Sequence, residues 1–207
     1  MKITLKELGR RFNREWIFKD VNLSFRSNSS YAILGPNGSG KSTLLQVIAS
    51  SLNPSSGTID YSFEGRDIDP DLLYQYLSIA APYIDLIEEF SLSEMIDFHF
   101  SFKRPLPDFN KEAIIRLLDL EKSKHKALRF FSSGMKQRTK LALAFCSDTP
   151  ILLLDEPTSN LDIKGVDWYL SLVDAFSKNR LVIVCSNQEH EYGFCQRQIE
   201  ITDYKKF

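Results

Sequence analysis

The chain has 207 residues, and 43% of them are hydrophobic, which is enough for a sizeable core and excludes general disorder. Its 26 Lys and Arg residues against 27 Asp and Glu give a net charge of -1, so no basic field exists for non-specific binding of nucleic acid. No segment approaches the roughly 18 apolar residues of a membrane span, and the N-terminus lacks a secretory apolar core. Cys146, Cys185 and Cys195 form no Cys-x-x-Cys pair. We therefore expect a soluble chain in a reducing, cytoplasmic compartment, without a cysteine metal site.

The first part of the chain is predicted to be rich in β-strands. Between Lys2 and Phe25, apolar and polar residues alternate around a turn near Asn13, which predicts an antiparallel element. A turn cluster at 53–57 precedes a further alternating segment at 58–63.

A glycine-rich loop with the sequence Gly-Pro-Asn-Gly-Ser-Gly-Lys-Ser-Thr follows the apolar run 31–34 and precedes the helical pattern 42–52. Its spacing is typical of a phosphate-binding loop on a strand-to-helix turn, and the strand, lysine and helix together disfavour an ordinary Gly/Ser turn. Backbone N–H groups would hold phosphates, Lys41 would reach the β- and γ-phosphates, and the Ser42 hydroxyl would ligate Mg²⁺. The predicted nucleotide-binding residues of this loop are Gly35, Pro36, Asn37, Gly38, Ser39, Gly40, Lys41, Ser42 and Thr43.

The middle of the chain changes character. Between Ser91 and Phe145 apolar residues recur at helical spacing, interrupted at 105–107 by two prolines, which predicts an inserted helical subdomain. All-apolar runs at 151–154 and 181–185 suit central parallel strands. We expect one domain, residues 1–207, with the β-rich part and catalytic core at 1–85 and 148–207 and the helical subdomain at about 86–147.

Two acidic residues, Asp155 and Glu156, end the apolar strand 151–154. They should lie at the carboxyl edge of a parallel sheet, where such folds bind ligands. We expect Asp155 to hold Mg²⁺ through water, and Glu156 to act as the general base on a water aligned with the γ-phosphate. An acidic strand end facing solvent is the alternative, which the preceding phosphate-binding loop disfavours.

The segment 131–138, Phe-Ser-Ser-Gly-Met-Lys-Gln-Arg, resembles the Leu-Ser-Gly-Gly-Gln signature of ATP-binding cassette (ABC) proteins, and Ser-Asn-Leu-Asp at 159–162 resembles their D-loop. Both stand in the family's order around the Asp-Glu strand, although an ordinary helix N-cap would also explain Ser132 to Gly134. The resemblance covers nearly the whole chain and implies an α/β fold. In it, a P-loop NTPase core with a mostly parallel sheet carries an N-terminal antiparallel β subdomain and an inserted α-helical subdomain.

The resemblance also implies that two cassettes pair head to tail, as a homodimer or a heterodimer, with ATP between the phosphate-binding loop of one and the signature of the other. Phe12 occupies the place of the adenine-stacking aromatic, while simple packing of Phe12 or Trp16 in the hairpin is the alternative. The residues that the resemblance adds to the nucleotide site are Phe12, Ser132, Ser133, Gly134 and Asp162.

Two positions depart from the family pattern. Tyr83 stands where the family has a glutamine, and Asn187 stands where it has a histidine. We expect Asn187 to donate a neutral hydrogen bond to the γ-phosphate, without the charge or proton transfer that histidine provides. His190 would share a face with Asn187 only if a helix began at Ser186, and a solvent-facing His190 is favoured. Hydrolysis is therefore expected to be slow or unusually coupled.

The function predicted from these features is that of the ATP-binding and ATP-hydrolysing subunit of a membrane ABC transporter. It would use ATP and Mg²⁺, lie on the inner face of the cell membrane, and drive a separate transmembrane permease through closure of a dimer. The permease would dock near Tyr83 and the aromatic segment 90–102, unless those side chains form the subdomain's own core. A cytosolic ABC-type ATPase acting as a mechanical or regulatory switch is the alternative. The signature and D-loop disfavour a P-loop kinase or GTPase.

Overall fold

The computed structural model describes residues 1–205, which form two compact units. The core unit comprises Met1–Leu77, Pro150–Glu156 and the described part of the segment that begins at Asn179. The helical unit comprises Ser78–Thr149 and Pro157–Lys178. Strand β6 (Leu77–Ala80) lies at the point where the chain passes from one unit to the other.

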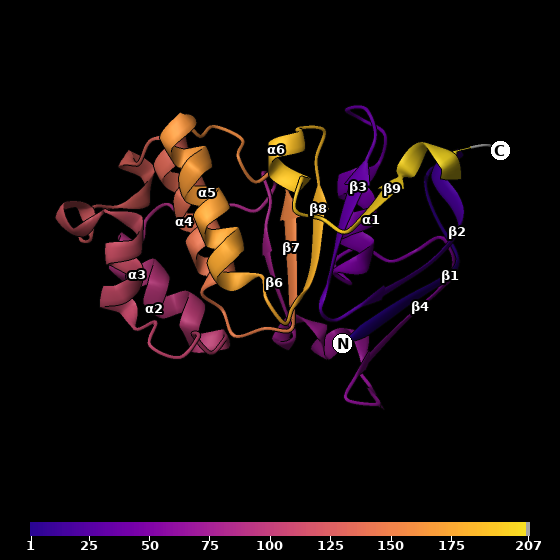
Figure 1. The fold of residues 1–207 in the computed structure, drawn as a ribbon, viewed down its shortest axis with the longest axis horizontal. Coiled ribbons are helices and arrows are strands. Elements are labelled where there is room, and N and C mark those ends of the chain that lie inside the picture. The colour runs from indigo at the N-terminus through magenta and orange to yellow at the C-terminus, as the bar shows by residue number, and fades with distance from the viewer. Residues whose placement is uncertain (206–207) are drawn as a thin grey trace. The chain divides into compact units, whose positions relative to one another are not determined.

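An antiparallel sheet forms the first part of the core unit, as the sequence predicts. Its strands are β1 (Lys2–Phe12), β2 (Glu15–Arg26), β4 (Ser56–Phe63) and β5 (Arg66–Asp67), in the order β2-β1-β4-β5. In β1, Ile3 and Leu5 are buried and alternate with more solvated neighbours, and Leu8 is buried after a register shift between Leu5 and Leu8. The three longer strands run side by side in Figure 1.

A parallel sheet forms the second part of the core unit. It contains β7 (Ile151–Asp155), β8 (Leu181–Cys185), β3 (Ser29–Leu34) and β9 (Arg197–Glu200), adjacent in that order. Every residue of β7 and β8 is buried, which explains why these strands are apolar throughout. Helix α1 (Lys41–Ile48) contacts β1, β7 and β8, and therefore lies between the two sheets (Figure 1).

The helical unit is built from α2 (Leu92–Phe102), α3 (Lys111–Leu118), α4 (Ser133–Phe145) and α5 (Ile163–Phe176). Helices α4 and α5 lie side by side (Figure 1) and α3 packs on α4. A buried cluster that includes Ile96, Ile114 and Leu118 forms the core of this unit. Within residues 1–205, no helix is both long enough and apolar enough to cross a membrane. The fold class predicted from the sequence is confirmed.

Candidate nucleotide-binding site

A pocket of about 190 Å³ lies at the carboxyl edge of the parallel sheet in the core unit. It is lined by residues 37–43, by Ile17 of β2 and by Glu156 after β7. The glycine-rich loop therefore forms most of its wall, as the sequence predicts. Ile17 carries no motif and was not predicted; its only signal is an apolar side chain on the strand face opposite the buried Phe18.

The loop backbone needs glycine at two positions. Gly40 has a φ of 101°, and a Cβ atom there would lie 2.4 Å from Cγ2 of Ile17. Gly35 has a φ of 141°, and its Cβ would lie 2.7 Å from Cγ2 of Ile201. Both the left-handed conformation and the close approach exclude other residues, so the loop can curl tightly in front of α1.

Helix α1 begins at the pocket without a side-chain cap. Gly40 occupies the N-cap position, and the first turn of α1 contains no acidic residue. The free N–H groups of a first helical turn and the positive end of the helix attract anions. This helix start is therefore suited to phosphate oxygens.

Lys41 supplies the full positive charge of the pocket. Its side chain is 5% exposed, and its Nζ donates hydrogen bonds to the carbonyl oxygens of Gly35 at 2.7 Å and Pro36 at 3.3 Å. The ammonium is thus held over the loop, beside the uncapped helix start. A buried ammonium in this position can bind phosphate oxygens strongly because little solvent screens it.

Asp155 is the last residue of β7 and is fully buried. Among the residues that the structure describes, no group completes a hydrogen bond to either of its carboxylate oxygens. Burial raises the pKa of Asp155 to about 6, the Ser42 hydroxyl opposes this shift, and the Glu156 carboxylate adds to it. Two buried carboxylate oxygens beside a serine hydroxyl are the hard oxygen ligands that Mg²⁺ prefers, so the site fits this ion.

Glu156 has an unusual backbone. Its φ is 43°, in the left-handed region that residues with a Cβ rarely adopt, and its N–H donates a hydrogen bond of 2.9 Å to the carbonyl of Cys185 on β8. The side chain lines the pocket. Such strain persists where surrounding contacts hold it, and it is common at active sites.

Asn187 follows β8 and is exposed at the edge of the phosphate-binding loop. Its Nδ2 donates a hydrogen bond of 2.9 Å to Oδ1 of Asn37. Helix α6 (Glu189–Tyr192) begins at Glu189 rather than Ser186, so the helical spacing that would place His190 beside Asn187 is absent. His190 is exposed, in agreement with the solvent-facing position that the sequence favours.

The signature and D-loop residues lie in the helical unit. The Ser132 Oγ accepts a hydrogen bond of 3.2 Å from the N–H of Met135 and caps α4, while the Ser133 side chain is exposed. A Cβ on Gly134 would lie 3.0 Å from the carbonyl oxygen of Asn160, so the D-loop backbone passes close to the signature. Asp162 caps α5 by accepting a hydrogen bond of 2.8 Å from the N–H of Gly165. The N-cap interpretation thus describes the contacts of Ser132 within this chain.

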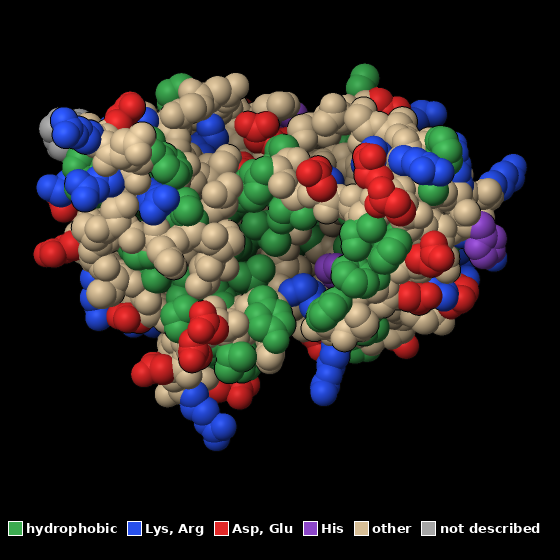
Figure 2. All heavy atoms as spheres, turned by 180° about the vertical axis from the view of Figure 1, so that it is seen from behind, with side chains coloured by type: hydrophobic (Ala, Val, Ile, Leu, Met, Phe, Trp, Pro, Cys, Tyr) green, Lys and Arg blue, Asp and Glu red, His purple; other side chains and the backbone are tan. Residues whose placement is uncertain are grey.

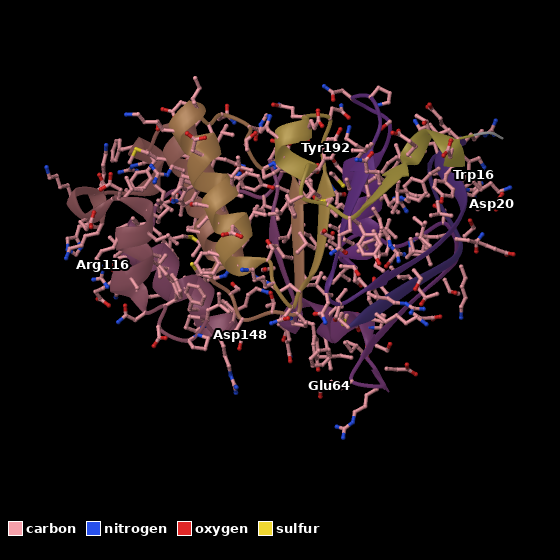
Figure 3. All side chains as sticks on the ribbon, viewed as in Figure 1. Trp16, Asp20, Glu64, Arg116, Asp148 and Tyr192 are labelled. Atoms are coloured by element: carbon pink, nitrogen blue, oxygen red, sulfur yellow. The ribbon has the colours of Figure 1, made fainter. Side chains whose placement is uncertain are left out.

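The two aromatic residues considered for contact with the adenine lie outside the pocket wall. Phe12 ends β1, is 47% exposed, and has the guanidinium of Arg10 4.6 Å from its ring centre. Figure 3 places Trp16 on β2, where Arg11 and Lys19 lie over its ring. Neither aromatic side chain is among the described residues that line the phosphate-loop pocket. Tyr83 is 40% exposed in the helical unit.

A family model described as ABC transporter matches residues 18–159 of the chain. A "Probable iron chelatin transport ATP-binding protein" of Helicobacter pylori is 32% identical over 90% of the chain and 77% of its own length. The lantibiotic transport ATP-binding protein SrtF of Streptococcus pyogenes is 28% identical, with 89% of the chain and 79% of SrtF covered. The sulfate/thiosulfate import ATP-binding protein CysA of Yersinia pestis is 32% identical over 98% of the chain and 58% of CysA.

Solved structures share this fold. A dimeric ATP-binding cassette in a post-hydrolysis state with ADP and Pi matches with a TM-score of 0.81 at 23% identity, covering 96% of the chain and 93% of the cassette. A bacterial Atm1-family exporter with ATP bound matches with a TM-score of 0.80 at 21% identity, covering 96% of the chain and 36% of the exporter.

Proposed function

Because the chain belongs to the ABC transporter family and is an ATP-binding ATPase subunit of that family, we propose that it closes on ATP in a dimer and drives a separate permease. The observation that carries this proposal is the grouping of three elements in one pocket: the uncapped start of α1, the buried ammonium of Lys41 and the acidic end of β7. Together they can hold a triphosphate and activate water beside it.

We propose that Mg²⁺ accompanies the nucleotide and is held by the Ser42 hydroxyl and, through water, by Asp155. The buried carboxylate of Asp155, beside the Ser42 hydroxyl, supports this assignment. When bound, the ion would neutralise charge on the β- and γ-phosphates. It would also offset the electrostatic penalty of keeping Asp155 ionised.

Glu156 is proposed as the general base, because its side chain lines the same pocket as Lys41. Asn187 is proposed to donate its amide N–H to the γ-phosphate from its place beside Asn37. An amide carries no positive charge, so it stabilises the transition state less than a protonated imidazole would. Slow hydrolysis by the isolated chain is the expected result.

The dimer would place the signature of one copy on the nucleotide of the other. In the helical unit, Ser133 and the start of α4 are exposed, which leaves the N–H groups at this helix end open to a phosphate. Phe12, exposed at the end of β1, is proposed to stack on the adenine. Asp162 would act through the D-loop geometry that it fixes by capping α5. Neither a homodimer nor a heterodimer is favoured by these contacts.

The permease is proposed to dock on the helical unit at the inner face of the membrane. Phe90, Phe98 and Phe102 form an edge-to-face series with ring centres 5.5 and 5.2 Å apart. Phe90 packs against the core of the unit, whereas Phe102 is 62% exposed. Figure 2 shows hydrophobic side chains gathered in a band on the helical unit. The outer rings of the series are thus available to a partner, and Tyr83 is exposed as well.

No observation favours the cytosolic switch, because the relatives described above have transport names. Those names refer to an iron chelatin, a lantibiotic and sulfate or thiosulfate, so they point to no common cargo for this chain.

The proposal is tested by isolating the tagged chain in detergent from the cells that produce it naturally and identifying any multi-span membrane protein that co-purifies with it. A complex that survives purification in detergent, and that hydrolyses ATP faster than the free chain, is the expected result. Phe102→Glu should dissociate the complex, whereas Leu170→Glu, at an exposed apolar position on α5, is the matched control. A chain found entirely in the soluble fraction of those cells, with no membrane protein bound, would contradict the transport function.

A further inference from the structure

A buried carboxylate that no motif identified is hydrogen-bonded to Ser186, the residue before Asn187. Glu191 belongs to the short helix α6, whose last residue, Tyr192, is labelled in Figure 3, and its side chain is completely buried. Buried carboxylates are rare unless their oxygens bind donors. One donor here is the hydroxyl of Ser186, which donates its hydrogen bond to Oε2 of Glu191.

The Ser186 hydroxyl is part of a directional chain of hydrogen bonds. Besides donating to Glu191, its oxygen accepts the backbone N–H of Gln188 at 2.8 Å. The backbone N–H of Ser186 in turn donates to the carbonyl of Ile33 on β3 at 3.3 Å. Because the hydroxyl hydrogen of Ser186 points to Oε2 of Glu191, a lone pair of the hydroxyl oxygen is left to accept the N–H of Gln188.

Asn187 lies between Ser186 and Gln188, the two residues joined by this series of hydrogen bonds. With Ser186 and Gln188 both fixed, the backbone of Asn187 is held on each side, and its Nδ2 donates to Oδ1 of Asn37 in the phosphate-binding loop. Asn187 itself is exposed and makes no contact that buries its side chain. Its orientation is therefore set by the neighbouring Ser186–Glu191 pair together with the hydrogen bond to Asn37.

We propose that Glu191 is a positioning residue for ATP hydrolysis, which acts through Ser186 to aim the amide of Asn187 at the γ-phosphate side of the phosphate-binding loop. The proposal rests on the ATPase function and on the role given to Asn187 above. Because Glu191 acts only through Ser186 and Asn187 and contacts neither nucleotide nor metal, removing its side chain should lower kcat rather than the affinity for nucleotide.

The test is a double-mutant cycle on the steady-state hydrolysis of ATP with Mg²⁺. Glu191→Ala should lower kcat by several-fold to about tenfold, with the KM for ATP changed less than twofold, because only an orientation used in the transition state is lost. Glu191→Gln keeps an acceptor oxygen for Ser186 and should restore most of the rate. Glu189→Ala, at an exposed glutamate on the same helix, is the matched control.

In an Asn187→Ala background, Glu191→Ala should cause almost no further loss, since the residue that it positions is already gone. An additive loss in that background, or a Glu191→Gln variant as impaired as Glu191→Ala, would overturn the proposal. Thermal unfolding of each variant accompanies the cycle: if Glu191→Ala does not fold, Ser186→Ala breaks the same hydrogen-bond chain and takes its place. A wild-type protein that hydrolyses no ATP would instead refute the ATPase function itself.

Discussion

The side-chain amide of Asn187 donates a 2.9 Å hydrogen bond to Oδ1 of Asn37, so the turn after β8 is tied directly to the phosphate-binding loop. Asn37 belongs to the loop that lines the nucleotide pocket. This contact links the end of a central strand to the place where the γ-phosphate is expected. The neutral amide therefore stands where a histidine would contribute positive charge.

Restoring the family residues should raise the rate of hydrolysis. In the double variant Tyr83→Gln with Asn187→His, a charge-assisted hydrogen bond replaces a neutral one, which is worth about 1 kcal/mol or more and corresponds to a several-fold to tenfold gain in kcat. Phosphate release by the isolated chain measures this, and the two single variants separate the contributions. An unchanged rate in all three variants would show that these positions do not carry the expected roles.

Lys41→Ala should abolish productive ATP binding. The variant removes the only full positive charge among the described residues that line the pocket. Lys41 is only 5% exposed, so little solvent screens this charge. Equilibrium binding of a fluorescent ATP analogue measures the loss. Lys122→Ala, at an exposed lysine in the helical unit, should bind like the wild type. Wild-type affinity in Lys41→Ala would refute the assignment of the phosphate-binding loop.

Asp155 should make the metal-free, nucleotide-free protein less stable as the pH rises. Its pKa is raised from 3.8 to about 6 in the folded protein, so the unfolded chain loses this proton first. Below about pH 4 the Asp155 carboxyl is protonated in both the folded and the unfolded state, so it does not lower the free energy of unfolding. The loss of stability grows between about pH 4 and pH 6 and stays constant above that, at about 3 kcal/mol. Asp155→Asn should therefore unfold at higher denaturant than the wild type at pH 7 in the presence of a chelator.

The comparison needs two controls. The stability difference between Asp155→Asn and the wild type should shrink at pH 4.5, where the wild-type carboxyl is protonated in the folded state. Asp174→Asn, at an exposed aspartate on α5, should show no such pH-dependent difference. A destabilised Asp155→Asn at pH 7 would mean that the carboxylate has compensating partners in solution.

Local patterns predicted the elements that position the site, because burial and turn chemistry act on neighbouring residues. The all-apolar β7 and β8, the alternating β1 and β2, and the strand-to-helix turn before α1 follow directly from their sequences. Contacts between distant segments could not be predicted in this way. The Asn187–Asn37 bond joins residues 150 positions apart, and Ile17 reaches the pocket from a different sheet.

The backbone strain at Glu156 and the burial of Glu191 could not be predicted from the sequence either. Nothing in the order Asp-Glu-Pro indicates that Glu156 adopts a φ of 43°, because the hydrogen bond from its N–H to Cys185 depends on the pairing of β7 with β8. Glu191 resembles any glutamate of a polar segment until the fold buries it. No helix begins at Ser186, because its side chain accepts the N–H of Gln188 and holds the chain in a turn before α6.

Glu156→Gln should leave ATP binding intact and slow hydrolysis by about two to four orders of magnitude, the usual scale for the loss of a general base. The amide keeps the shape of the side chain but cannot accept the proton of the attacking water. Single-turnover hydrolysis separates this step from product release. Turnover like that of the wild type would show that another group activates the water.

The claim that two copies of this chain clamp ATP between them, which is the homodimeric form of the proposed pairing, is tested most directly by the mass of Glu156→Gln in solution. Light scattering after gel filtration should give a monomer in ADP and twice that mass in ATP with Mg²⁺, because the nucleotide is held without being hydrolysed. Ser133→Glu, which places a negative charge at the exposed start of α4, should remain monomeric when combined with Glu156→Gln in ATP. A Glu156→Gln protein that binds ATP and stays monomeric at every concentration measured would contradict the claim.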